Sequence, residues 1–130
     1  MSFSLDMSKF VKHAGKNADQ VVRKTAIDLF TSVMQGTPVD SGRARGAWMA
    51  DINKFSTTAP TTIRSDSAVT AEIIGTAVQY KAGDLITFSN NLAYIERLEY
   101  GWSKQAPQGM VRLNIMKFQT FVNNATRTLS

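Results

Sequence analysis

Cysteine is absent from this chain of 130 residues, and histidine occurs once, at His13. Without cysteine there is no disulfide framework and no thiolate to act as nucleophile or metal ligand. A single histidine lacks the partners that a catalytic triad or a metal site needs, so we interpret His13 as a surface residue. An enzyme would require a pocket of convergent titratable groups, which this composition does not favour.

Long apolar runs and phosphate-binding loops are also missing. No stretch approaches the length of a membrane span, and we expect no membrane partner. The first residues, Met1 to Asp6, lack a cationic start followed by an apolar run, so we expect no signal peptide. Gly42 and Gly46 do not have the spacing of a nucleotide-binding loop.

The charge balance is basic, with 15 Lys and Arg against 10 Asp and Glu and a net charge of +5. Such an excess attracts polyanions such as DNA, so a small DNA-binding accessory module is the alternative function. The cations are scattered, however, and the longest run is Arg23-Lys24. Scattered charge favours an ordinary solvated surface with at most weak, non-specific DNA contact. Length and the 43% hydrophobic content predict one domain over 1–130.

A long amphipathic helix is predicted from about Met7 to about Gln35, with Asp6 as its cap. Its apolar residues recur at spacings of three and four and form one stripe. Gly36 and Pro38 end the pattern, because glycine accepts a left-handed cap and proline cannot continue the helix.

Short strands follow. The segment Arg43 to Ile52 predicts a first strand or a turn leading into one, with Trp48 in the core. The Ser- and Thr-rich segment Asn53–Asp66 is expected to be a loop or an irregular edge. Alternation and β-branched residues predict strands over Val69–Gly75 and Leu85–Phe88.

Two further helices complete the expected fold. Asn90 or Asn91 would cap a short helix from Leu92 to about Tyr100, which Gly101 would stop. A last helix is expected from Met110 to about Arg127. The predicted class is α+β, with a long N-terminal helix, a small mainly antiparallel sheet, and the short and C-terminal helices packed on it.

Two segments concentrate turn-formers, arginines and aromatics: Thr37–Trp48 and Tyr94–Arg112. Loops usually carry function on a rigid scaffold. Because neither segment contains a catalytic constellation, the pair indicates binding rather than chemistry.

The charged residues of these segments have two interpretations. Arg43 and Arg45 either bind an acidic partner or phosphates, or pair internally, for instance with Asp40, Glu96 or Glu99. Glu96 and Glu99 are three residues apart, so both can face one side of a helix. We interpret them as ion-pair partners or interface residues rather than as acid–base catalysts.

Trp102 follows the helix stop Gly101 and precedes a polar loop. An exposed tryptophan is unusual unless it anchors a partner, but local packing against Tyr100 is the other interpretation.

The order of the motifs, "TPVDSGRARGAW", then "YIERLEYGWSKQAPQGMVRL", then a closing helix, resembles one family. It is similar to the HK97 gp10-like, or lambda gpZ-like, tail-completion (neck) proteins of long-tailed bacteriophages. The resemblance implies a non-enzymatic virion protein without cofactor or metal. Such a protein completes the head-proximal end of the tail and helps to join tail to head, as a ring subunit around the DNA path.

The resemblance also implies partners and a location. The partners would be copies of the chain in a ring, usually six, together with tail-terminator or tail-tube proteins and head-completion or connector proteins. The location would be the virion neck, after assembly in the host cytoplasm. The residues expected to contact these partners are Pro38, Asp40, Arg43, Arg45, Glu96, Glu99, Trp102, Lys104, Gln105, Pro107 and Gln108.

Overall fold

The structure of the protein, a computed structural model, describes residues 1–5, 17–39, 42–101 and 103–129. Asp6 as a helix cap, the first part of the predicted long helix and His13 lie outside the described residues. The remainder of that helix is confirmed as α2, Ala18–Gly36.

Three antiparallel strands form the sheet, in the order β1-β3-β2. Of the two interpretations of Arg43–Ile52, the strand is present as β2, Trp48–Ile52. The predicted strand over Leu85–Phe88 is confirmed as β3, Ile86–Asn90. A single helical turn, α3 (Arg43–Gly46), precedes β2. The third strand, β1 (Ser2–Leu5), was not predicted, because its four residues are too few for a clear alternation signal.

The core lies between α2 and the sheet and is built on stacked aromatic rings. Phe88 of β3 stacks on Trp48 with ring centroids 4.6 Å apart, and on Phe30 of α2 at 4.5 Å. Leu29 and Val33 of the same helix are fully buried around them. The prediction that Trp48 belongs to the core is therefore confirmed.

The predicted strand over Val69–Gly75 is wrong, because this segment lies in a helix, α4 (Asp66–Ala77). The Ser65 hydroxyl accepts a hydrogen bond from the Ala68 N–H at 3.1 Å and caps the helix. Val69, Ile73 and Ala77 recur every four residues and are buried. Apolar residues also occupy the outer face of α4, so the helical period is hidden and β-branched side chains imitate a strand.

The two later helices differ from their predicted bounds. The short helix α5 runs only over Ile95–Glu99, and neither Asn90 nor Asn91 caps it. Asn90 is instead the last residue of β3, where its side chain donates to the Ala44 carbonyl and accepts from the Leu92 N–H.

The predicted C-terminal helix is divided into α6 (Val111–Met116) and α7 (Phe118–Leu129). At the break, the Lys117 N–H donates a hydrogen bond to the Asn114 carbonyl, three residues earlier, as in a 3₁₀ turn. The buried Asn114 side chain bonds to Ser32 of α2 at 2.5 Å, which fixes α6 against that helix.

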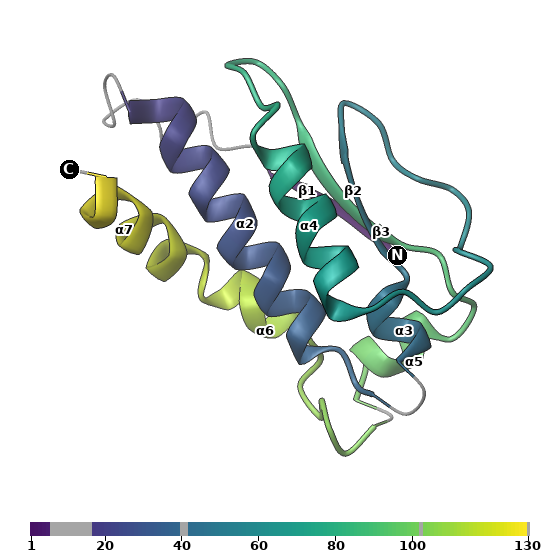
Figure 1. Ribbon diagram of the computed structural model, residues 1–130. Coiled ribbons are helices and arrows are strands. Elements are labelled where there is room, and N and C mark those ends of the chain that lie inside the picture. Colours follow the sequence, from purple (N-terminus) through teal and green to yellow (C-terminus); the bar gives the residue numbers. More distant parts are fainter. Residues whose placement is uncertain (6–16, 40–41, 102, 130) are drawn as a thin grey trace.

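The helices α7, α2 and α4 lie side by side in front of the sheet, with α2 between the other two (Figure 1). This arrangement confirms the predicted α+β class. It leaves the outer faces of α4 and α7 on different sides of the molecule. The turn α3 and the helix α5 lie together at the end of the molecule where α2 finishes.

Candidate protein-contact surface

The two motif segments meet at one end of the molecule, although they are far apart in the sequence. The Gln105 side-chain amide binds the backbone of Val39 at both positions, accepting from its N–H at 2.8 Å and donating to its carbonyl at 3.0 Å. Figure 1 shows α3 and α5 at this same end. The structure therefore joins the two candidate segments into one surface.

The first segment is held by interior contacts. The buried Thr37 hydroxyl donates to the Val33 carbonyl and accepts from the Trp48 indole N–H, each at 2.8 Å. Arg45 donates to the Gln35 carbonyl at 2.8 Å and forms an ion pair with Asp66 at 3.1 Å. Arg45 thus pairs within the chain, with Asp66, an acid that the sequence analysis did not suggest.

Glu99 organises the second segment. Its carboxylate is only 2% exposed, and one oxygen accepts from the N–H groups of Met110 and Val111 at 3.0 and 2.8 Å. The other oxygen accepts from the N–H and Nε of Arg112 at 2.9 and 3.0 Å. The Arg112 guanidinium also lies 5.0 Å from the centre of the Tyr100 ring. Glu99 therefore links α5 to the start of α6 from within, as an ion-pair partner, and offers no surface to a partner protein.

Two glycines let the loop between α5 and α6 fold back tightly. Gly101 ends α5 with φ +88°, as predicted for a helix stop, and a Cβ there would lie 2.5 Å from the Pro107 carbonyl oxygen. Gly109 has φ +81°, and a Cβ there would lie 2.4 Å from the Glu99 carbonyl oxygen. Both positions need glycine for backbone angle and for space.

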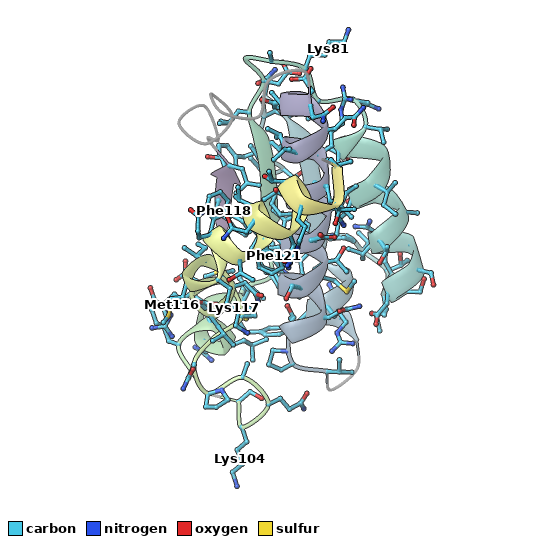
Figure 2. All side chains as sticks on the ribbon, turned by 90° about the vertical axis from the view of Figure 1, so that its left-hand side faces the viewer. Lys81, Lys104, Met116, Lys117, Phe118 and Phe121 are labelled. Atoms are coloured by element: carbon cyan, nitrogen blue, oxygen red, sulfur yellow. The ribbon has the colours of Figure 1, made fainter. Side chains whose placement is uncertain are left out.

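The remaining expected contact residues divide by exposure. Pro38 is buried and Arg43 is half-buried, whereas Asp40 and Trp102 lie outside the described residues. The exposed members are Glu96, Lys104, Gln105, Pro107 and Gln108. Figure 2 shows Lys104 at the tip of this end, with Lys81 at the opposite end of the molecule.

A shallow pocket of about 200 Å³ lies beneath the loop, lined by residues that include Gly36, Pro107, Met110 and Leu113. Small-molecule sites usually have volumes of about 300–1,000 Å³. Within the described part of the chain, no group of three or more His, Asp or Glu residues could hold a metal ion. None of the described helices combines the length and the hydropathy that a membrane span requires.

One carboxyl has a perturbed acidity, and it lies away from this surface. Hydrogen bonding from the Asn53 amide, and then from the Lys81 backbone N–H, lowers the pKa of Asp84 below its ordinary value. Both bonds stabilise the turn before β3. The shift therefore belongs to a structural turn rather than to a reactive site.

Several exposed apolar side chains were not predicted from the sequence as surface features. The predicted strand over Val69–Gly75 contained Ile74, and the predicted last helix contained Ile115 and Met116. In the structure Ile74, Val78, Ile115 and Met116 are all exposed. The sequence feature that could have identified Ile74 and Val78 is the segment 66–78, in which apolar residues occur on every side of a helix.

No protein-family model, no curated protein and no solved structure matches this chain.

Proposed function

We propose that this protein is a non-enzymatic virion structural protein that completes the head-proximal end of a phage tail. In this proposal it acts in the neck as a ring subunit around the DNA path and helps to join tail to head. The observation that carries the proposal is the meeting of the two resemblance-bearing segments at one end, through Gln105 and Val39. Segments that share one surface can act on one partner.

The exposed part of this end suits recognition rather than chemistry. Lys104, Pro107 and Gln108 project from a loop that Gly101, Gly109 and the buried Glu99 hold in place. A preorganised loop loses little conformational freedom when it binds, which favours affinity. We propose that this end contacts a head-completion protein or a tail protein.

The DNA-binding alternative gains no support from the arginines that suggested it. Arg45 uses its donors on Asp66 and on backbone carbonyls of the chain. Arg43 is half-buried and has an interaction partner as well. Arginines engaged in this way are poorly placed to neutralise phosphates.

A matched pair of double variants tests the proposal. Lys104→Ala with Gln108→Ala alters the candidate end, whereas Gln79→Ala with Lys81→Ala changes the same residue types at the opposite end. Each protein is mixed with the tail-terminator, tail-tube and head-completion proteins of the phage that encodes it, and complexes are detected by mass. We expect the wild type and the control to bind at least one partner, and the first variant to bind more weakly. A wild-type chain that binds none of these proteins would contradict the proposal.

A further inference from the structure

The outer face of α4 is unusual for an exposed helix because it carries no charge along its length. Ser67, Ala71, Ile74 and Val78 are spaced by four, three and four residues, so they form one line, and all four are exposed. Ile74 is 44% and Val78 59% exposed. Ala68 and Gly75 lie beside them and are also exposed. We call these six residues the α4 face.

A second exposed apolar surface lies at the junction of α6 and α7. Met116 is 83% and Ile115 48% exposed. Figure 2 shows Met116, Phe118 and Phe121 on the side of the molecule that carries α7, with Lys117 beside Met116. Phe118 and Phe121 are half-buried and pack partly against the core. We call the exposed Ile115 and Met116, together with these two rings, the α6–α7 face.

The two faces look away from each other across α2. The helix α2 packs against both α4 and α7, which lie on either side of it (Figure 1). Buried Val69, Ile73 and Ala77 turn the other side of α4 inward, so its outer face points away from α2. Two apolar faces on different sides of one molecule are the requirement for a head-to-tail contact between copies.

Charge decides between pairing of like faces and pairing of unlike faces. The segment 111–129 contains Arg112, Lys117 and Arg127 and no acidic residue. Two α6–α7 faces brought together would therefore place cations against cations, which costs free energy. The helix α4 contains Asp66 and Glu72 and no basic residue. Asp66 pairs with Arg45, and Glu72 pairs with Arg64, so the side of α4 carries no excess of positive charge. The Asp66 carboxylate is also half-exposed. The α4 face would therefore not repel the cations of the α6–α7 face.

Side-chain size also favours the pairing of unlike faces. The α4 face consists mainly of small side chains, with Ile74 and Val78 toward one end. The α6–α7 face offers large side chains, of which Met116 protrudes furthest into solvent. Large side chains pack well into a shallow surface of small ones, whereas two small-residue faces leave gaps and two protruding faces collide.

We infer that the α4 face of one copy binds the α6–α7 face of the next copy, and that this is the lateral contact of a ring. The contact rests on the ring function proposed above and adds the two surfaces that would form it. It leaves the end that carries Lys104 free for proteins above or below the ring.

Cross-linking tests this contact directly, because the natural chain has no cysteine. One protein carries Ala71→Cys and a second carries Met116→Cys, both at exposed positions. The probe is a short bismaleimide, applied to each protein alone and to an equal mixture. We expect cross-linked dimers mainly in the mixture, and higher multimers when both substitutions are in one chain.

Several results would overturn the inference. Cross-links of equal yield in the single-variant samples would show that like faces pair. An oligomer detected by mass without cross-links would show that other surfaces form it. A chain that stays monomeric at every concentration, and gives no cross-link with neck and tail proteins present, would also refute the contact.

A variant separates the contact from the wider function. Ile74→Lys places a cation opposite the cations of the α6–α7 face, and we expect self-association at least about tenfold weaker. The exposed position should leave the melting temperature unchanged. Gln20→Lys, which adds the same charge at an exposed position of α2 outside both faces, is the control. Weak self-association with retained binding to neck proteins would support the contact, whereas unchanged self-association would refute it.

A ring that forms through this contact but binds no neck or tail protein would refute the proposed function and leave the contact standing.

Discussion

Glu99 is the residue on which the candidate end depends most. Its carboxylate accepts three backbone N–H groups and one guanidinium N–H, all between 2.8 and 3.0 Å. Glu99→Gln would replace one oxygen by an NH₂ group that faces donors instead of acceptors. We expect a loss of about 1–3 kcal/mol in the free energy of unfolding. Chemical denaturation measures this free energy. Glu96→Gln, on the exposed side of α5, is the control and should change the free energy of unfolding little. Equal stability of both variants would contradict the assignment.

Gly109 is the second residue-scale requirement. Gly109→Ala adds a Cβ that would meet the Glu99 carbonyl oxygen at 2.4 Å and the carboxylate at 2.7 Å, at a φ of +81°. Strain of this kind costs on the order of 1–3 kcal/mol. We expect a lower melting temperature and weaker binding to neck proteins, because the loop must move. Gly75→Ala in α4 has open space around the new methyl group and should preserve or raise stability. A Gly109→Ala protein as stable as the wild type would exclude a tight loop.

At the scale of elements, α4 closes the outer edge of β2. The Glu72 carboxylate accepts from the Ala50 N–H at 3.2 Å, and the Thr76 hydroxyl donates to the Ala50 carbonyl at 3.3 Å. Arg64 donates to the Trp48 carbonyl at 3.2 Å. Side chains thus satisfy an edge that would otherwise pair with another strand. In the proposed contact, this side of the molecule would therefore bind through a helix face rather than by sheet extension.

The cap of α4 gives a prediction at this scale. Ser65→Ala removes the acceptor for the Ala68 N–H, and we expect a cost of about 0.5–2 kcal/mol. Because α4 seals β2, the loss should appear in global unfolding rather than as local fraying. Ser67→Ala, on the exposed face of the same helix, is the control for the removal of a serine hydroxyl. Thermal unfolding of the two variants should differ, and identical curves would argue against the cap.

For the whole molecule, we predict weak, non-specific DNA binding despite the net charge of +5. A ring around a DNA path must let the DNA move, and tight phosphate contacts would oppose that. Each neutralised phosphate adds about 0.9 to the slope of log affinity against log salt, so we expect a shallow slope. Titration of labelled duplex DNA at several salt concentrations measures it. Tight binding at physiological salt that disappears after Arg43→Ala with Arg45→Ala would favour the DNA-binding alternative.

Features that depend on a few neighbouring residues could be predicted from the sequence. It predicted the α+β class, the helix that ends at Gly36, the strands around Trp48 and Phe88, and the stop at Gly101, because period, turn residues and glycine act over a few neighbours. It also selected the two segments that the structure brings together.

The other features could not be predicted from the sequence, because they depend on residues that are distant along the chain. Whether 69–75 is helix or strand is settled by packing against α2 and β2, since apolar residues on both faces remove the period from the sequence. The sequence pattern suggests that Glu99 is a surface residue. In the structure it is buried, because its carboxylate accepts hydrogen bonds from backbone N–H groups 11 to 13 residues further along the chain. The two exposed apolar faces likewise emerge only when α2 is placed between α4 and α7, because burial is a property of neighbours and not of the residue.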